Sequence, residues 1–240
     1  MTGLHKHYEL AGAKVEVLAD FTADFPKEQI TVVLGKSGCG KTTLIRLIAG
    51  LEDFESGSLE GPPPEKIGMV FQEPRLMPWL TVQDNITFGV KKAKLDQQAL
   101  VDVIKLVNLA GFEDAYPHQL SGGMQQRSAL ARALMYDPEV ILMDEPFSSL
   151  DYFIREAMQQ KIIEIYQSMK KSIVFVTHSV DEALILGHKI IVVGSGQVTK
   201  EYDLSKSSYP RDVLSEEMIA IKKDILCAIK SEDDQSERKL

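Results

Sequence analysis

Five short apolar runs recur along the chain, and polar or glycine-rich residues follow each of them. They occupy residues 30–34, 67–71, 140–143, 173–176 and 190–193. Runs of this length between turn residues are typical of strands buried on both faces of a parallel sheet. Helix-like segments separate most of the runs, so the pattern predicts an α/β fold in which strands and helices alternate.

The segments between the runs carry apolar residues at helical spacing. The stripes that predict helices are Leu44, Leu47, Ile48 and Leu51; Leu100, Val103, Ile104 and Val107; and Ile154, Met158, Ile162 and Ile165. Residues 81–135 are predicted to be helical, with Gly111 as a stop signal. Ser179 and Glu182 have the spacing of a capping box at the start of a further helix.

The two ends of the chain depart from this alternation. Residues 8–34 predict short strands, and residues 56–58 predict a loop. Residues 207–212 resemble a linker, and the apolar positions within residues 212–230 predict one terminal helix. Residues 231–240 are charged, so we expect a disordered tail.

Composition narrows the class of protein. The 240 residues are 44% apolar and 26% charged, which suits one large globular domain. The net charge of −8 argues against nucleic acid or an anionic lipid surface as the main partner. We expect no membrane-spanning helix and no export signal, and the two cysteines, Cys39 and Cys227, fit a reducing cytosol. Membrane contact then has to run through another protein.

One glycine-rich loop carries the clearest chemistry. It follows the run 30–34, precedes a predicted helix, and consists of Gly35, Lys36, Ser37, Gly38, Cys39, Gly40, Lys41, Thr42 and Thr43. This is the G-x-x-x-x-G-K-[ST] pattern of a P-loop, whose backbone N–H groups bind phosphate oxygens. Lys41 is predicted to reach the β- and γ-phosphates, and the Thr42 hydroxyl to bind Mg²⁺. The flanking strand and helix disfavour the alternative of an ordinary glycine turn.

Two acidic residues end the run 140–143. Asp144 is predicted to hold Mg²⁺, and Glu145 to orient or deprotonate the attacking water. The alternative is a pair of solvated acids at a strand end.

Four other features each leave two interpretations open. Tyr8 is either a surface tyrosine or a platform for the adenine ring. Ser121, Gly122 and Gly123 precede a helix and form a second candidate anion site, although such turns are common. His178 follows a predicted strand at its carboxyl end, where α/β proteins bind ligands, although a lone histidine is usually structural.

The fourth feature is a loop with two prolines and several large apolar residues, which favours docking of a partner. It includes Arg75, Leu76, Met77, Pro78 and Trp79. The alternative is that Trp79, the only tryptophan, fills the core of the helical segment.

Together these motifs resemble the ATP-binding subunit of ABC transporters over nearly the whole chain. Residues 120–127 match the signature motif, Asp144 and Glu145 the Walker B motif and catalytic glutamate, and Tyr8 the aromatic A-loop. Gln72 matches the Q-loop, residues 149–151 the D-loop, and His178 the switch histidine. The resemblance implies a P-loop NTPase (RecA-like) core with a small N-terminal antiparallel β subdomain and an inserted helical subdomain at residues 76–135. Residues 1–230 would form this single ABC ATPase domain.

The resemblance also implies a set of roles. Glu145, His178 and Gln72 would be catalytic, and Thr42, Gln72 and Asp144 would bind Mg²⁺ beside ATP. A second copy of the chain would form a head-to-tail dimer, in which Ser121, Gly122, Gly123 and Asp151 complete the neighbour's site. The loop from Arg75 to Trp79 would contact an integral membrane permease at the cytoplasmic face of the membrane.

Within the family, residues 71–79 resemble importers of nitrate, aliphatic sulfonates, taurine or thiamine precursors. An extracytoplasmic solute-binding protein would then be an indirect partner, and nucleic acid would not be one. The chain departs from the family pattern at residues 27–29 and at Ser148, neither of which has a catalytic role. The alternatives are a soluble ABC-type ATPase that is not coupled to transport, as in DNA repair or translation, and a non-ABC P-loop kinase.

Overall fold

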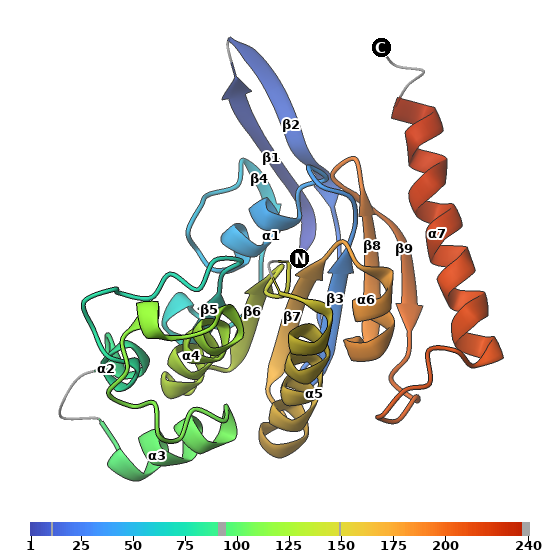
Figure 1. The fold of residues 1–240 in the computed structure, drawn as a ribbon. Coiled ribbons are helices and arrows are strands. Elements are labelled where there is room, and N and C mark those ends of the chain that lie inside the picture. Colours follow the sequence, from blue (N-terminus) through green and yellow to red (C-terminus); the bar gives the residue numbers. More distant parts are fainter. Residues whose placement is uncertain (11, 91–94, 149, 237–240) are drawn as a thin grey trace. The chain divides into compact units, whose positions relative to one another are not determined.

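A computed structural model describes residues 1–10, 12–90, 95–148 and 150–236 of the chain. The chain divides into two compact units (Figure 1). The first consists of Met1–Gly61 with Ser172–Leu240, and the second is Pro62–Lys171.

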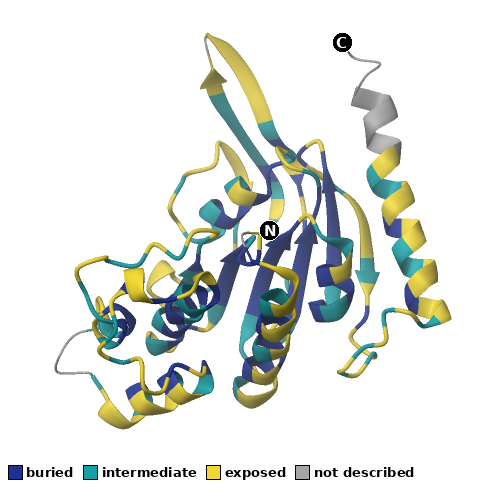
Figure 2. Cartoon of the chain, viewed as in Figure 1, coloured by how far each residue is buried: buried dark blue, intermediate teal, exposed yellow. Residues whose placement is uncertain are grey.

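The core of the first unit is a set of parallel strands. They are β3 (Ile30–Leu34), β7 (Ser172–Thr177) and β8 (Lys189–Gly194), with β3 between the other two. Figure 2 shows these strands as almost continuously buried, which explains their apolar sequences. The edge strand β9 (Gln197–Asp203) pairs antiparallel with β8 and was not predicted, because its mostly polar, exposed sequence carries no apolar run.

A second, antiparallel sheet begins the chain. Its order is β2-β1-β4, with β1 at Thr2–Leu10, β2 at Ala13–Phe21 and β4 at Ser56–Ser58. The prediction of a loop at residues 56–58 is wrong. Gly57 has φ +106°, and a Cβ there would lie 2.3 Å from the carbonyl oxygen of Gly3, so glycine allows β4 to approach β1 closely.

Three helices complete the first unit: α1 (Lys41–Ile48), α6 (Val180–Leu186) and α7 (Glu216–Ser236). The Ser179 hydroxyl caps α6 by accepting the Glu182 N–H at 3.3 Å, which confirms the serine half of the predicted capping box. The terminal helix begins later than predicted and continues into the range for which we expected disorder. Helix α7 continues through residues 231–236 because no glycine or proline interrupts the sequence there. Extending an existing helix also avoids the free-energy cost of nucleating a new one. Residues 237–240 lie outside the described part.

The segment predicted as a linker is held firmly against the first unit. The Arg211 guanidinium donates to the carbonyl oxygens of Leu184, at 3.0 Å, and Gly187, which end α6. Burial lowers the pKa of Arg211, and these carbonyls compensate the desolvated cation. Tyr209 stands edge-on to the His188 ring, with centroids 5.3 Å apart. The sequence did not predict this anchoring, because the carbonyl oxygens that bind Arg211 lie about 25 residues away along the chain.

In its described residues, the second unit combines two parallel strands with four helices. The elements are β5 (Ile67–Val70), α2 (Val82–Thr87), α3 (Gln97–Leu106), α4 (Gly122–Met135), β6 (Val140–Asp144) and α5 (Tyr152–Met169). Short 3₁₀ turns lie at Pro64–Lys66 and Pro117–Gln119. The predicted helical stop at Gly111 is wrong, since α3 ends at Leu106. Asn108 takes a left-handed conformation (φ +55°), and Arg127 binds its carbonyl oxygen at 2.7 Å.

In the part of the chain that the structure describes, no helix is both long enough and apolar enough to cross a membrane.

Candidate functional site

The P-loop joins β3 to α1 in the first unit. Its backbone passes so close to β8 that a Cβ on Gly35 would lie 2.5 Å from the carbonyl oxygen of Val193 and 2.6 Å from the Cys39 sulfur. Gly40 caps α1 with φ +100°, which a residue with a side chain rarely adopts. The glycines therefore allow a tight loop that ends at a helix N-terminus, where backbone N–H groups and the helix dipole favour an anion.

Lys41 lies inside this loop and is only 4% exposed. Its ammonium donates to the carbonyl oxygens of Gly35 at 2.8 Å and Lys36 at 2.7 Å. These bonds offset the cost of burying a cation and fix its position. Thr42 follows on the exposed first turn of α1, with an oxygen suited to a hard cation such as Mg²⁺. The arrangement can bind a polyanion together with a cation.

Tyr8, on β1, lies beside the helix that follows the P-loop. Its hydroxyl lies 3.4 Å from the Thr43 hydroxyl and donates to the Glu52 carboxylate. Burial, followed by the hydrogen bond to Glu52, raises the pKa of Tyr8. Tyr8 is therefore a partly exposed residue with side-chain partners, and its role as an adenine platform stays a prediction.

His178 lies at the same edge of the sheet as the P-loop. It follows Thr177, which is in register with Leu34, and the Gly35 N–H donates to the Thr177 carbonyl at 3.4 Å. The Thr177 hydroxyl donates to the buried Glu182 carboxylate at 2.5 Å and accepts the Ser179 N–H at 3.0 Å. These bonds orient the turn that presents the exposed His178 side chain.

The second unit places the two predicted acids and Gln72 at the carboxyl ends of adjacent strands. Strands β5 and β6 run parallel with Val70 opposite Met143, so Asp144, the last residue of β6, and Gln72, two residues after β5, lie at the same end of the pair. Asp144 is buried, whereas Glu145 is partly exposed and has φ +42°. A left-handed backbone conformation at a residue other than glycine typically raises the conformational free energy by about 1–3 kcal/mol. It persists where surrounding contacts impose it, often at active sites.

The signature residues begin α4. The Ser121 hydroxyl caps the helix by accepting the Met124 N–H at 3.3 Å, and Gly122 is exposed. The buried Gln126 side chain donates to the Phe71 carbonyl at 3.2 Å. The signature helix is thus bonded directly to the residue before Gln72. Sequence reasoning did not single out Gln126.

The proline-containing loop after Gln72 is held from both sides. Arg132 donates to the carbonyl oxygens of Pro74 at 2.9 Å and Arg75 at 2.8 Å. The fully buried Asn85 accepts the Met77 N–H at 2.7 Å and donates to three carbonyls of residues 77–81. Trp79 is 70% exposed, so the interpretation of Trp79 as a core residue is wrong. Sequence reasoning also missed Arg132 and Asn85, because polar residues in helices usually mark a solvated face.

The predicted site residues therefore fall into two groups. Tyr8, the P-loop and His178 belong to the first unit; Gln72, the loop from Arg75 to Trp79, the signature, Asp144, Glu145 and Asp151 belong to the second. Asp151 caps α5 by accepting the Ile154 N–H at 3.0 Å, while Ser149 of the predicted D-loop lies outside the described residues.

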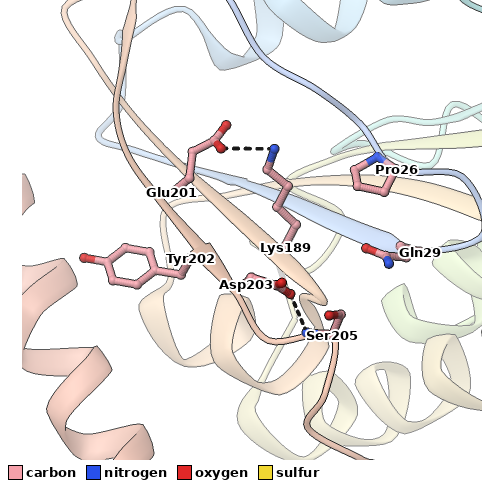
Figure 3. Close-up of a pocket in the computed structure, with 7 residues that line it drawn as sticks. All are labelled: Pro26, Gln29, Lys189, Glu201, Tyr202, Asp203 and Ser205. Carbon is pink, nitrogen blue, oxygen red and sulfur yellow. Dashed lines mark hydrogen bonds and ion pairs between the residues drawn. The ribbon is translucent and has the colours of Figure 1, made fainter.

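A separate pocket of about 440 Å³ opens at the other ends of the strands (Figure 3). Gln29 precedes β3 and Lys189 begins β8, and Lys189 is paired with Glu201 at 3.1 Å. None of the predicted site residues lines this pocket.

Comparison with known proteins decides among the interpretations of the P-loop. The sequence model of the ABC transporter family matches residues 18–148. The chain belongs to the ABC transporter family. It is 42% identical to an uncharacterized ABC transporter ATP-binding protein of Methanocaldococcus jannaschii, over 95% of this chain and 90% of the relative.

Two further relatives of this ABC protein are named for import. It is 40% identical to the aliphatic sulfonates import ATP-binding protein of Bacillus cereus, over 92% of this chain and 91% of the relative. It is 42% identical to the taurine import ATP-binding protein of Pelagibacter ubique, over 82% of this chain and 79% of the relative.

Solved structures resemble the ABC protein in fold. A dimeric ATP-binding cassette in a post-hydrolysis state, bound to ADP and Pi, is 28% identical, with a TM-score of 0.74 over 85% of this chain and 97% of that one. The predicted P-loop α/β fold, the antiparallel N-terminal sheet and the ATPase activity are confirmed. The findings favour an ATPase coupled to transport over the soluble alternative.

The space around the two signature glycines, Gly122 and Gly123, predicts that alanine is tolerated at one position and not at the other. A Cβ on Gly123 would lie 2.5 Å from the Ile154 side chain, whereas one on Gly122 would meet only Leu150, at 3.9 Å. We expect Gly123→Ala to destabilise the protein by about 1–3 kcal/mol through overpacking, and Gly122→Ala to leave stability unchanged. Thermal denaturation of both variants tests this, and equal melting temperatures would contradict the packing described.

Proposed function

We propose that this chain is the ATP-hydrolysing subunit of an importer for small sulfonates such as aliphatic sulfonates or taurine. The observation that carries the proposal is the identity of about 40%, over more than nine-tenths of the chain, with subunits named for aliphatic sulfonate import. Nitrate and thiamine-precursor importers, which the sequence also resembles, are the neighbouring possibilities. Transport through a separate permease would place the chain on the cytoplasmic face of the membrane as a peripheral subunit.

ATP is the proposed ligand of the P-loop. Backbone N–H groups from Gly35 to Thr43 would bind the phosphates, Lys41 would neutralise their densest charge, and the Tyr8 ring would stack on adenine. The fixed Lys41 ammonium and the contact between Tyr8 and Thr43 support these roles.

Mg²⁺ fits the oxygen donors that the chain offers. Thr42, Gln72 and Asp144 supply a hydroxyl, an amide carbonyl and a carboxylate, and Mg²⁺ prefers such hard ligands in combination with nucleotide phosphates. The ion would neutralise charge that develops on the phosphates during hydrolysis. Glu145 would accept a proton from the attacking water, and His178 would contact the γ-phosphate or hold that water.

A head-to-tail dimer is the proposed active form. Ser121, Gly122 and Gly123 would present a helix N-terminus to the γ-phosphate held by the second copy, with Asp151 nearby. The exposure of Ser121 and Gly122 supports this role, since it leaves the start of α4 accessible to a ligand. The dimeric state of the solved relative bound to ADP and Pi supports it as well.

The loop from Arg75 to Trp79 is the proposed contact with the permease, and includes Leu76, Met77 and Pro78. Arg132 and Asn85 hold its backbone while Trp79 stands in solvent, as a preformed docking site requires. Gln126 links the signature helix to the strand end just before Gln72, so movement of that helix can reach this loop through bonded residues. A solute-binding protein outside the cell would act only through the permease.

Replacing Glu145 by glutamine separates ATP binding from hydrolysis. The amide keeps the size of the side chain but cannot accept a proton, so we expect unchanged ATP affinity and turnover reduced by roughly 100-fold or more. Lys41→Ala is the contrasting control and should lose most ATP affinity. Calorimetry and a phosphate-release assay measure both effects. Parental turnover in the Glu145→Gln variant would show that another residue serves as the base.

Trp79→Ala tests the proposed permease contact. Because the side chain is already exposed, the melting temperature and basal ATPase activity of the subunit should not change. Loss of an interface hot spot should weaken assembly with the permease by about 2 kcal/mol or more. Pull-down with the coexpressed permease measures the effect, and full recovery of the permease would move the docking site elsewhere. Asn85→Ala is a useful companion, since it should lower both stability and assembly.

A further inference from the structure

Two large aromatic side chains stand in solvent directly after Asp151. Tyr152 and Phe153 are 71% and 79% exposed, and their rings meet edge to face with centroids 5.5 Å apart. They open helix α5. Adjacent exposed aromatics of this size make an apolar patch that calls for a partner, whereas scattered exposed apolar residues do not.

The backbone below this aromatic pair is fixed by hydrogen bonds. The Asp151 side chain accepts the Ile154 N–H at 3.0 Å, and the Asp151 carbonyl accepts the Arg155 N–H at 2.9 Å. The Arg155 guanidinium also donates to the Leu150 carbonyl at 3.1 Å. The two rings are therefore presented from a preorganised turn, and ordering them on binding costs little conformational entropy.

The aromatic pair is continuous with the signature element of the same unit. Residues on both sides of the pair face the signature glycines: Ile154 lies against Gly123, and Leu150 lies nearest to Gly122. Whatever covers the exposed start of α4 therefore also lies close to Tyr152 and Phe153.

We propose that Tyr152 and Phe153 pack against a second copy of this chain and form a hot spot of the ATP-bound dimer. The inference rests on the proposed dimer, in which the signature faces the neighbouring subunit. The pair exposes roughly 300 Å² per subunit, judged from the usual size of aromatic side chains. Two-fold symmetry doubles this area to roughly 600 Å², a substantial part of the about 1,600 Å² of a standard interface. Aromatic anchors of this kind typically dominate the binding energy of an interface.

The test measures ATP-dependent dimerisation in the Glu145→Gln background, where hydrolysis does not dissolve the dimer. Sedimentation velocity at several protein concentrations, with ATP and Mg²⁺, compares this parent with Tyr152→Ala/Phe153→Ala. We expect the dimer dissociation constant to rise at least about tenfold, with ATP affinity of the monomer unchanged. Leu10→Ala/Leu214→Ala is the matched control, because those side chains are also exposed, at 59% and 78%, but belong to none of the elements proposed to form the dimer contact, so dimerisation should not change.

A conservative variant guards against an indirect effect on folding. Tyr152→Phe/Phe153→Leu keeps most of the apolar area, and it should dimerise nearly as tightly as the parent. Equal dimerisation of the alanine variant and the parent would overturn the inference while leaving the proposed dimer intact. Normal dimerisation of the alanine variant together with lost binding to the permease would also overturn the inference, since the aromatic pair would then face the permease. A parent that stays monomeric with ATP would overturn the proposed dimer itself, and the inference with it.

Discussion

The buried ammonium of Lys41 is the interaction on which the nucleotide site depends. A cation this deeply buried needs compensating oxygens, and the carbonyls of Gly35 and Lys36 supply them only because the loop closes tightly. That closure requires glycine where the loop meets β8 and a left-handed Gly40 at the start of α1. The loop is therefore preorganised for a polyanion, because its dipoles and its cation already occupy fixed positions.

Three polar side chains, of which Gln126 and Asn85 are buried, give the second unit its functional geometry. Gln126 binds the residue before Gln72, Arg132 binds the loop that follows, and Asn85 holds that loop around Trp79. Each bond joins a helix to irregular backbone and so fixes that backbone in place. A rigid loop that carries an exposed tryptophan suits the transmission of movement from a nucleotide site to a partner, and a flexible loop would absorb such movement.

Sequence reasoning was strongest where local chemistry is decisive. The P-loop lies between β3 and α1, the two acids lie at the end of β6 and the signature begins α4, as predicted, because short-range glycine, capping and apolar patterns specify these positions. It failed where distant backbone supplies the partners. Strand β4 forms only because Gly57 approaches Gly3, and the segment around Arg211 is held by the end of α6. The roles of Asn85 and Arg132 were likewise not predicted, since the sequence around a polar residue does not reveal which distant backbone carbonyl it will bind.

The central claim is that the P-loop of one subunit works with the signature of another. Complementation between two inactive variants, Lys41→Ala and Gly122→Asp, tests it most directly. Each variant alone should lack ATPase activity, since every site in its dimer contains a defect. Mixing equal amounts should restore up to about a quarter of parental activity, because random pairing puts half of the dimers in mixed form with one complete site each. If the mixture stays inactive although mixed dimers form, the two elements act within one subunit and the account is contradicted.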